Sequence, residues 1–221
     1  MILDMARADV REYLFQAMCE VLDSANIEYV KWDMNRSMCD IYSASLPAER
    51  QGEVYHRCML GVYELLERLT AAFPDLMIEG CSGGGGRFDA AMLYYSPQIW
   101  CSDDTDAVER LEIQYGTSFL YPIGAVGSHV SACPNHQTGR ITPFHTRGVV
   151  AMAGSFGYEL DLMKMSEEEK KTAREQILKY KEMEHLVQSG DYYRLVNPFE
   201  NNNHVLWQFV SKDKKKQLCA E

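Results

Sequence analysis

The 221-residue sequence lacks any apolar run near the roughly 18 residues that a membrane-spanning helix needs. It also lacks a positively charged start followed by an apolar stretch, because Asp4 and Asp9 lie close to its beginning, so we expect no secretory signal. Basic residues are scarcer than acidic ones, 22 against 32, and the formal net charge is -10 at pH 7. We therefore expect neither nucleic acid nor a membrane as a partner.

Paired cysteine motifs are also missing. The seven cysteines are odd in number, irregularly spaced and contain no Cys-x-x-Cys pair. This pattern argues against a disulfide framework and against a zinc site, and it favours reduced thiols in a reducing compartment. His136 and His145 are too irregularly spaced to indicate a metal site. The expectation is a cytoplasmic protein without a bound metal.

Strand and helix patterns alternate along most of the chain. Strands are predicted at residues 28–33, 76–81, 98–101, 124–130 and 156–162, and helices at residues 8–26, 49–73, 87–95, 107–120, 146–154 and 166–188. Short links join these segments, and Ser166 is a suitable N-cap for the last helix. The fivefold alternation predicts parallel βαβ units and an α/β fold.

The pattern changes after Gly190. Residues 192–196 and 204–210 alternate between apolar and polar side chains, as antiparallel strands do, and Asn201–Asn203 is predicted to form a turn between them. Lys212–Lys216 is a solvated charge run. We therefore predict a domain division near Ser189, into residues 1–189 and 190–221.

The stretch Tyr29–Arg36 begins as an apolar strand and ends in polar residues, namely Lys31, Asp33, Asn35 and Arg36. In a (β/α) barrel, the C-terminal ends of the strands carry the catalytic side chains. Nearby cations favour the charged form of a carboxylate, so Asp33 is expected to stay ionised and to suit a nucleophile or an electrostatic stabiliser. On this stretch alone, a surface ion-pair cluster is an equally good interpretation.

Further polar clusters follow the next predicted strands. They are Cys81 with the glycine run 82–86, then Asp103, Asp104 and Asp106, and then His129. In a parallel barrel these clusters share one face, so Asp33 and Asp103 are expected to converge. Two carboxylate clusters from separate strands are suited to acid–base or nucleophilic work on a glycosidic bond. Trp32 and Trp100 lie beside them, and aromatic faces suit sugar rings.

Each cluster also has a structural alternative. The glycine run could hold a phosphate, but it lacks the lysine and hydroxyl residue of a P-loop, so room for a ligand's close approach is favoured. Asp106 or Thr105 is expected to cap the following helix, which leaves Asp103 for chemistry. The acidic cluster lacks the glycine and closing glutamate of a calcium loop. No base adjoins Cys81, so packing or substrate contact is favoured for it, and His129 is expected to be structural.

Five blocks of the sequence resemble α-galactosidases of glycoside hydrolase family 36 in their order and separation. The blocks are Lys31–Arg36, Glu79–Arg87, Trp100–Asp106, His129–Arg140 and Gly157–Asp161.

The resemblance implies a role for each matching residue. Asp33 corresponds to the nucleophile of the family and Asp103 to its acid/base. The residues implied to contact the galactose are Lys31, Asn35 and Cys81, and we add Gly83, Trp100 and Asp104 to the expected substrate-binding set. A retaining mechanism would place the Asp33 and Asp103 carboxyls roughly 5–5.5 Å apart, against roughly 6.5–9.5 Å for an inverting one.

The resemblance also implies a fold and an activity. The expected fold is a partial (β/α)8 TIM barrel, about strands 4–8, followed by the start of a C-terminal antiparallel β-domain. The expected activity is that of a retaining α-galactosidase acting on α-galactosides such as melibiose and raffinose, without a cofactor and as part of a homo-oligomeric parent. Family members carry further domains and strands, so the chain is expected to be a fragment.

Other functions fit the same blocks. An α-N-acetylgalactosaminidase and a galactosyltransferase on this scaffold are the enzymatic alternatives. An inactive sugar-binding or assembly fragment is the alternative from another class, because incomplete sheets leave edges that invite association.

Overall fold

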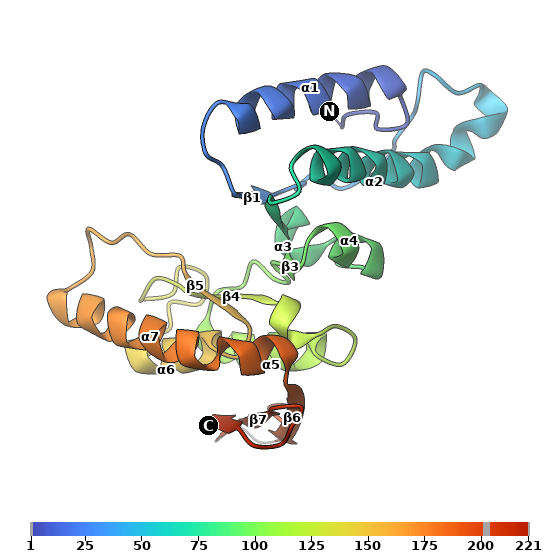
Figure 1. Ribbon diagram of the computed structural model, residues 1–221. Helices are drawn as coiled ribbons and strands as arrows, with labels where there is room; N and C mark the ends of the chain where they lie inside the picture. The colour runs from blue at the N-terminus through green and yellow to red at the C-terminus, as the bar shows by residue number, and fades with distance from the viewer. Residues whose placement is uncertain (1, 201–203, 221) are drawn as a thin grey trace. The chain divides into compact units, whose positions relative to one another are not determined.

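Helices and strands alternate along the chain, as its apolar pattern predicts. The structure, a computed structural model, describes residues 2–200 and 204–220, and its fold is mixed α/β. It divides into two units, Met1–Pro97 and Gln98–Glu221, which are coloured in chain order in Figure 1. The turn expected at Asn201–Asn203 lies outside the described residues.

The first unit is built on two long helices and a pair of strands. Its elements are α1 (Ala8–Asp23), β1 (Tyr29–Trp32), the 3-10 helix η1 (Ala48–Glu53), α2 (Val54–Ala72), β2 (Met77–Gly80), α3 (Ser82–Gly85) and α4 (Ala90–Tyr95). Helices α1 and α2 lie side by side (Figure 1), and Leu22, Leu65 and Leu69 are buried where they pack. Gly61 of α2 permits the close approach of the segment before α1, because a Cβ there would lie 2.0 Å from the carbonyl oxygen of Met5.

Strands β1 and β2 pair in parallel, with Trp32 opposite Gly80 at their C-terminal ends. Ile78 is buried in β2, and Val30 packs against the core beneath α1 and α2. The pairing continues past the strands, since the Cys81 backbone N–H donates to the Trp32 carbonyl over 2.9 Å. The residues that follow β1 and the residues that follow β2 therefore start from the same, C-terminal end of the strand pair.

The second unit combines parallel and antiparallel pairing. Its elements are β3 (Gln98–Ile99), α5 (Ala107–Thr117), the 3-10 helix η2 (Ile123–Ala125), β4 (Gly127–Val130), α6 (Phe144–Ala151), β5 (Ser155–Tyr158), α7 (Glu167–Ser189), β6 (Asp191–Val196), β7 (Leu206–Val210) and β8 (Gln217–Ala220). Strand β4 pairs with β5 in parallel, and Ile99 forms a parallel bridge with Val126. Helices α6 and α7 pack against each other and against these strands (Figure 1).

The strands after Gly190 form an antiparallel sheet in the order β6–β7–β8, which confirms the predicted change of pattern. Strand β8 was not predicted. The charge run at 212–216 forms the connection between β7 and β8, and the Ser211 N–H closes it by donating to the Lys216 carbonyl over 2.9 Å. Within the second unit this sheet contacts α7. The division into barrel and β-domain at 189/190 stays a prediction.

Several predicted boundaries are corrected by the structure. The helix expected over 49–73 starts as the 3-10 helix η1, and its α-helical part begins at Val54. The strands expected over 98–101 and 156–162 are shorter, because β3 ends at Ile99 and β5 at Tyr158. The predicted Ser166 cap is confirmed: its hydroxyl and the Glu169 side chain form a reciprocal capping box at the start of α7.

No helix among the described residues is long and apolar enough to cross a membrane. Parallel pairing joins β1 to β2 and β4 to β5, as βαβ units require. Closure of these strands into part of a barrel stays a prediction.

Candidate active site

The glycine run after β2 forms a left-handed turn. Ser82, Gly83, Gly84 and Gly85 all have positive φ, at 73°, 63°, 73° and 85°. The Gly85 N–H donates to the Cys81 carbonyl over 3.2 Å, which closes the turn. Glycine reaches this region at little cost, whereas a residue with a Cβ is strained there. The run therefore allows a backbone turn that other residues would disfavour, and Ser82 tolerates the strain.

This turn directs backbone donors at Asp33. The N–H groups of Ser82 and Gly83 donate to Asp33 Oδ1 over 3.0 and 3.3 Å, and Asn35 Nδ2 donates to Asp33 Oδ2 over 2.8 Å. Successive N–H groups in such a turn make a concave site for an anion. Here the anion is a side chain of the protein itself, and Gly83, expected to give room for a ligand, contributes its amide to Asp33.

The donors around Asp33 decide its protonation. Partial burial by itself would raise the pKa of Asp33, but hydrogen bonds from Asn35, Cys81, Gly83 and Ser82 outweigh it and hold this pKa below its ordinary value. The predicted ionised state agrees with this direction. The cause differs from the prediction, because neutral N–H and S–H donors supply the effect rather than neighbouring cations.

Cys81 contributes a neutral thiol to this group. The residue is 5% exposed, and burial together with the negative charge of Asp33 raises the pKa of the thiol, against an opposing backbone hydrogen bond from Gly84. A thiol with a raised pKa is a poor nucleophile and a competent donor to a carboxylate. The geometry favours the contact role predicted for Cys81 over covalent chemistry.

Lys31 has a partner that the sequence analysis did not single out. Its Nζ lies 3.5 Å from Glu79 Oε1, and the two residues are register partners across the parallel pair β1–β2. Glu79 is 1% exposed and also accepts a hydrogen bond from the Tyr29 hydroxyl. Burial and the Glu79 carboxylate raise the pKa of Tyr29. Glu79 is the charged position in an otherwise apolar predicted strand, and that irregularity was the available signal.

The loop after β1 is held by Arg87. Its Nη1 and Nη2 donate to the carbonyl oxygens of Met34 and Arg36 over 2.5 and 3.1 Å. The last residue of the block Glu79–Arg87 therefore fixes the backbone on either side of Asn35, so that the Asn35 amide stays within reach of Asp33.

In the second unit, Asp106 caps α5, as predicted for that residue or Thr105. Its Oδ1 accepts from the N–H groups of Val108 and Glu109 over 2.8 and 3.2 Å. The carboxylate is 1% exposed, and Thr138 Oγ1 donates to its Oδ2 over 2.6 Å. Burial would raise the pKa of Asp106, but these donors together with Arg140 hold it below its ordinary value. Asp106 is a structural anchor between α5 and the loop after β4.

That loop also fixes the backbone beside Asp103. Gln137 Nε2 donates to the Asp103 carbonyl over 2.6 Å, and Gln137 Oε1 accepts from the Thr105 N–H over 2.9 Å. Asn135 Nδ2 donates to Thr105 Oγ1 over 3.1 Å. Asp104 Oδ1 accepts from the Asp106 N–H over 2.9 Å, so one of its oxygens stabilises the turn. Residues of the His129–Arg140 block thus hold the segment that carries Asp103.

Trp100 lies in the interior of the second unit. The residue is 3% exposed, and its ring stacks on His129, with ring centroids 4.7 Å apart and an interplanar angle of 18°. The aromatic face expected to accompany a sugar ring is therefore covered by His129. This packing also gives His129 the structural role predicted for it.

The expected site residues form two groups. Asp33, Asn35, Cys81 and Gly83 lie together in the first unit, with Lys31 on the adjacent Glu79. The second unit holds the others, which are Trp100, Asp103 and Asp104. The structure describes each group within its own unit, so the expected separation of the Asp33 and Asp103 carboxyls stays a prediction. Across residues 2–200 and 204–220, no three His, Cys, Asp or Glu side chains are grouped to hold a metal ion.

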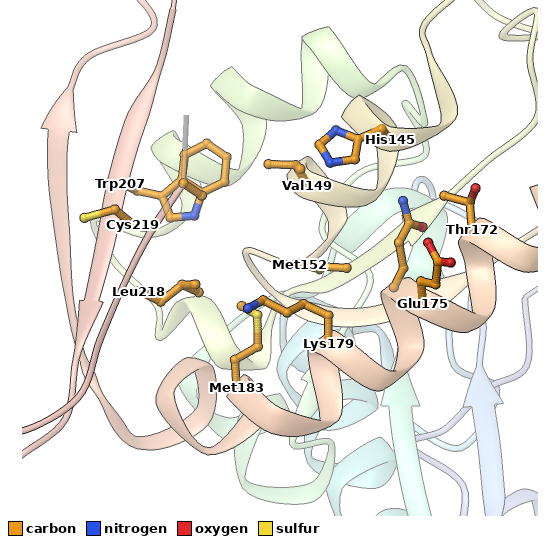
Figure 2. Close-up of a pocket in the computed structure, with 12 residues that line it drawn as sticks. His145, Val149, Met152, Thr172, Glu175, Lys179, Met183, Trp207, Leu218 and Cys219 are labelled. Carbon is orange, nitrogen blue, oxygen red and sulfur yellow. The ribbon is translucent and has the colours of Figure 1, made fainter.

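A separate cavity of about 450 Å³ lies in the second unit between α6, α7 and the C-terminal sheet. Figure 2 shows Val149 of α6, Met152 just after α6, Met183 of α7, and Trp207 and Leu218 of the sheet around it. It includes none of the predicted site residues. Its lining is largely apolar, and its polar side chains do not converge on one point in this view.

The chain matches known proteins over nearly its whole length. The family model described as Melibiase matches residues 1–190. Alpha-galactosidase AgaA of Geobacillus stearothermophilus is 55% identical over 220 residues, covering 100% of this chain and 30% of that protein. The bifunctional alpha-galactosidase/sucrose kinase AgaSK of Mediterraneibacter gnavus is 56% identical over 220 residues, covering 100% of this chain and 23% of that protein.

Solved structures agree with these matches. The structure of a variant of the GH36 alpha-galactosidase AgaA in complex with raffinose has a TM-score of 0.96 and 55% identity, covering 99% of this chain and 30% of that chain. A variant of the same enzyme in complex with stachyose has a TM-score of 0.95. The chain therefore spans about 30% of the length of the relative AgaA.

Proposed function

Since this chain belongs to the melibiase family, we propose that it forms the catalytic part of a retaining α-galactosidase of glycoside hydrolase family 36. Its substrates are terminal α-galactosides of the raffinose type, which accords with the relative AgaA in complex with raffinose and with stachyose. The activity is assigned to the chain within a protein of its relatives' length.

The observation that carries this proposal is the environment of Asp33. Its carboxylate follows a parallel strand, accepts hydrogen bonds from Asn35, Ser82 and Gly83, and has a depressed pKa. An ionised carboxylate in a fixed orientation meets the need of a nucleophile that must form a glycosyl ester. A surface ion pair would not require a left-handed turn of backbone amides to hold the carboxylate, with the non-glycine residue Ser82 at positive φ.

The proposed mechanism has two steps. Asp33 attacks the anomeric carbon from the β face while Asp103 protonates the glycosidic oxygen, so the leaving sugar departs as an alcohol and a β-galactosyl ester forms. Water then attacks that carbon from the α face, Asp103 takes its proton, and Asp33 is released. Two inversions return α-galactose, and no cofactor is needed.

The proposal also includes the barrel fold, the galactose contacts, the location in the cell and the oligomeric state. Parallel pairing in both units and the antiparallel C-terminal sheet support a partial (β/α)8 barrel followed by a β-domain. We assign galactose contacts to Lys31, Asn35, Cys81 and Asp104, whose polar groups follow the strands. Free cysteines throughout the described chain suit a cytoplasmic location, and by family resemblance the parent is a homo-oligomer.

A chimera tests the proposed function. In it, the matching segment of AgaA is replaced by residues 1–221, which we call the AgaA chimera. We expect it to hydrolyse raffinose and p-nitrophenyl α-galactoside, and NMR should detect α-galactose as the first product. The isolated chain, assayed in parallel, tells whether these residues suffice alone.

The same assay separates the alternatives. A preference for p-nitrophenyl N-acetyl-α-galactosaminide would indicate the N-acetylgalactosaminidase, and transfer to sugar acceptors in place of water would indicate the transferase. A folded chimera that binds galactosides without turnover would support the inactive sugar-binding alternative. Initial release of β-galactose would contradict retention.

Replacing Cys81 with serine in the AgaA chimera should weaken substrate binding more than it slows turnover. The hydroxyl keeps a donor for Asp33, while the smaller, more polar group changes the contact with the sugar. We expect KM to rise several-fold and kcat to stay within about threefold, in line with loss of a single neutral contact. Cys219→Ser, at an exposed position of β8, is the matched control. Complete loss of kcat with unchanged binding would contradict this role.

A further inference from the structure

The indole of Trp100 makes a direct contact with the carboxylate assigned as acid/base. Trp100 Nε1 donates to Asp103 Oδ1 over 3.1 Å. The contact links a buried ring to an exposed carboxylate three residues further along the chain. The indole N–H is a donor only, so Asp103 Oδ1 is the acceptor in this hydrogen bond.

We propose that Trp100 is a positioning residue that selects which oxygen of Asp103 carries the catalytic proton. The proposal rests on the function proposed above. Because Oδ1 accepts from the indole, the proton of the acid form resides on Oδ2. In the first step Oδ2 gives this proton to the glycosidic oxygen, and in the second step Oδ2 accepts a proton from the attacking water. The indole N–H stays on Oδ1 throughout.

The ring is held rigidly enough for this role. His129 stacks on it at 4.7 Å, and the Arg110 guanidinium lies 4.6 Å from its centroid. Arg110 is itself 3% exposed and donates to the carbonyl oxygens of Ser102 and Gly127 over 3.1 and 2.6 Å. Rotation of the indole would break the stacking and the cation–π contact together. The N–H therefore has a fixed direction toward Asp103.

The backbone of Asp103 is held as well. Gln137 donates to the Asp103 carbonyl over 2.6 Å. The main chain and one side-chain oxygen are thus both fixed, which leaves Oδ2 as the oxygen that can meet a substrate. A role for Trp100 as a sugar platform would require an open ring face, whereas the residue is 3% exposed and its ring contacts His129 and Arg110.

Leaving-group dependence in the AgaA chimera tests the proposal. Trp100→Phe keeps an aromatic ring for His129 and removes the N–H. We expect kcat/KM for raffinose to fall about tenfold, the usual scale for one lost hydrogen bond to a charged group. For 2,4-dinitrophenyl α-galactoside, whose leaving group needs little protonation, we expect a change below about twofold. The control is Trp207→Phe, at a buried tryptophan of β7. It should change kcat/KM for neither raffinose nor 2,4-dinitrophenyl α-galactoside.

Other outcomes overturn the proposal. Equal losses on both substrates, or a rise in KM alone, would make Trp100 a packing residue or a sugar contact. If Trp100→Phe does not fold, β-(3-benzothienyl)alanine at position 100 keeps the bicyclic ring and replaces the N–H by sulfur. We again expect kcat/KM to fall for raffinose and to change little for 2,4-dinitrophenyl α-galactoside.

A readout without activity separates this proposal from the proposed function. In the 221-residue chain, Asp103→Ala should move the indole N–H signal of Trp100 in the ¹H–¹⁵N spectrum upfield and leave those of Trp32 and Trp207 in place. An unmoved signal would contradict the hydrogen bond, and thus the positioning role, even if the AgaA chimera hydrolyses galactosides. A moved signal with an inactive chimera would contradict only the function.

Discussion

Replacing Asp33 with alanine in the AgaA chimera is expected to abolish turnover, by roughly 10⁴-fold or more, the scale seen when an enzyme loses its nucleophile. The reason is that no other group can form the glycosyl ester. Azide should restore product formation, because it fits the space of the lost carboxylate and needs no deprotonation. It attacks the α-galactoside once from the β face, so the product is β-galactosyl azide. NMR of the anomeric proton identifies this configuration.

The control for this experiment is Asp75→Ala. Asp75 is an exposed carboxylate between α2 and β2, at the opposite end of the strand from Cys81. It should leave turnover unchanged and form no azide product. If Asp33→Ala retained hydrolysis, or gave the azide of α configuration, the assignment of Asp33 as nucleophile would be wrong.

Replacing Asp103 with alanine should slow raffinose hydrolysis by about 10²- to 10⁴-fold, the usual contribution of a general acid. An activated substrate such as 2,4-dinitrophenyl α-galactoside should still form the glycosyl ester, because its leaving group needs little protonation. Hydrolysis of that ester lacks its base, so a burst of dinitrophenol precedes slow turnover. Azide should speed turnover and yield α-galactosyl azide, because it attacks the β-galactosyl ester on Asp33 from the α face and inverts the anomeric carbon a second time.

The two azide products therefore distinguish the roles of the two carboxylates with one analytical method. Asp213→Ala, at an exposed position in the β7–β8 connection, is the matched control. Equal loss on raffinose and on the activated substrate, without a burst, would contradict an acid/base role for Asp103. The β azide from this variant would reverse the two assignments.

Local sequence signals accounted for much of the fold. The spacing of apolar residues located α1 and α2, and Ser166 marked the start of α7, because a helix needs partners for its first N–H groups wherever it lies. Short strands were harder to delimit. Only residues 98–99 of the predicted strand 98–101 pair as a strand, because pairing depends on a neighbour distant in the chain.

The sequence predicted which motifs contribute to the candidate site, but not most of the hydrogen bonds and ion pairs between their residues. Asp33 and Asp103 could be named because acidic residues follow predicted strands within blocks that resemble a known family. Glu79 was passed over, since its partner Lys31 is its neighbour only through parallel pairing of β1 and β2. The glycine run was predicted to give room for a ligand, which stays a prediction. The structure adds that amides of this run, at positive φ, donate to Asp33.

The sequence by itself determined the family of this chain, the alternation of its elements and the residue types available for chemistry. These follow from composition, spacing and motif, which are properties of neighbouring positions. Only the tertiary structure decided that hydrogen-bond donors, rather than cations, keep Asp33 ionised, and that Trp100 is buried against His129 with its N–H on Asp103. Such contacts depend on backbone direction and burial, which arise when distant segments pack together.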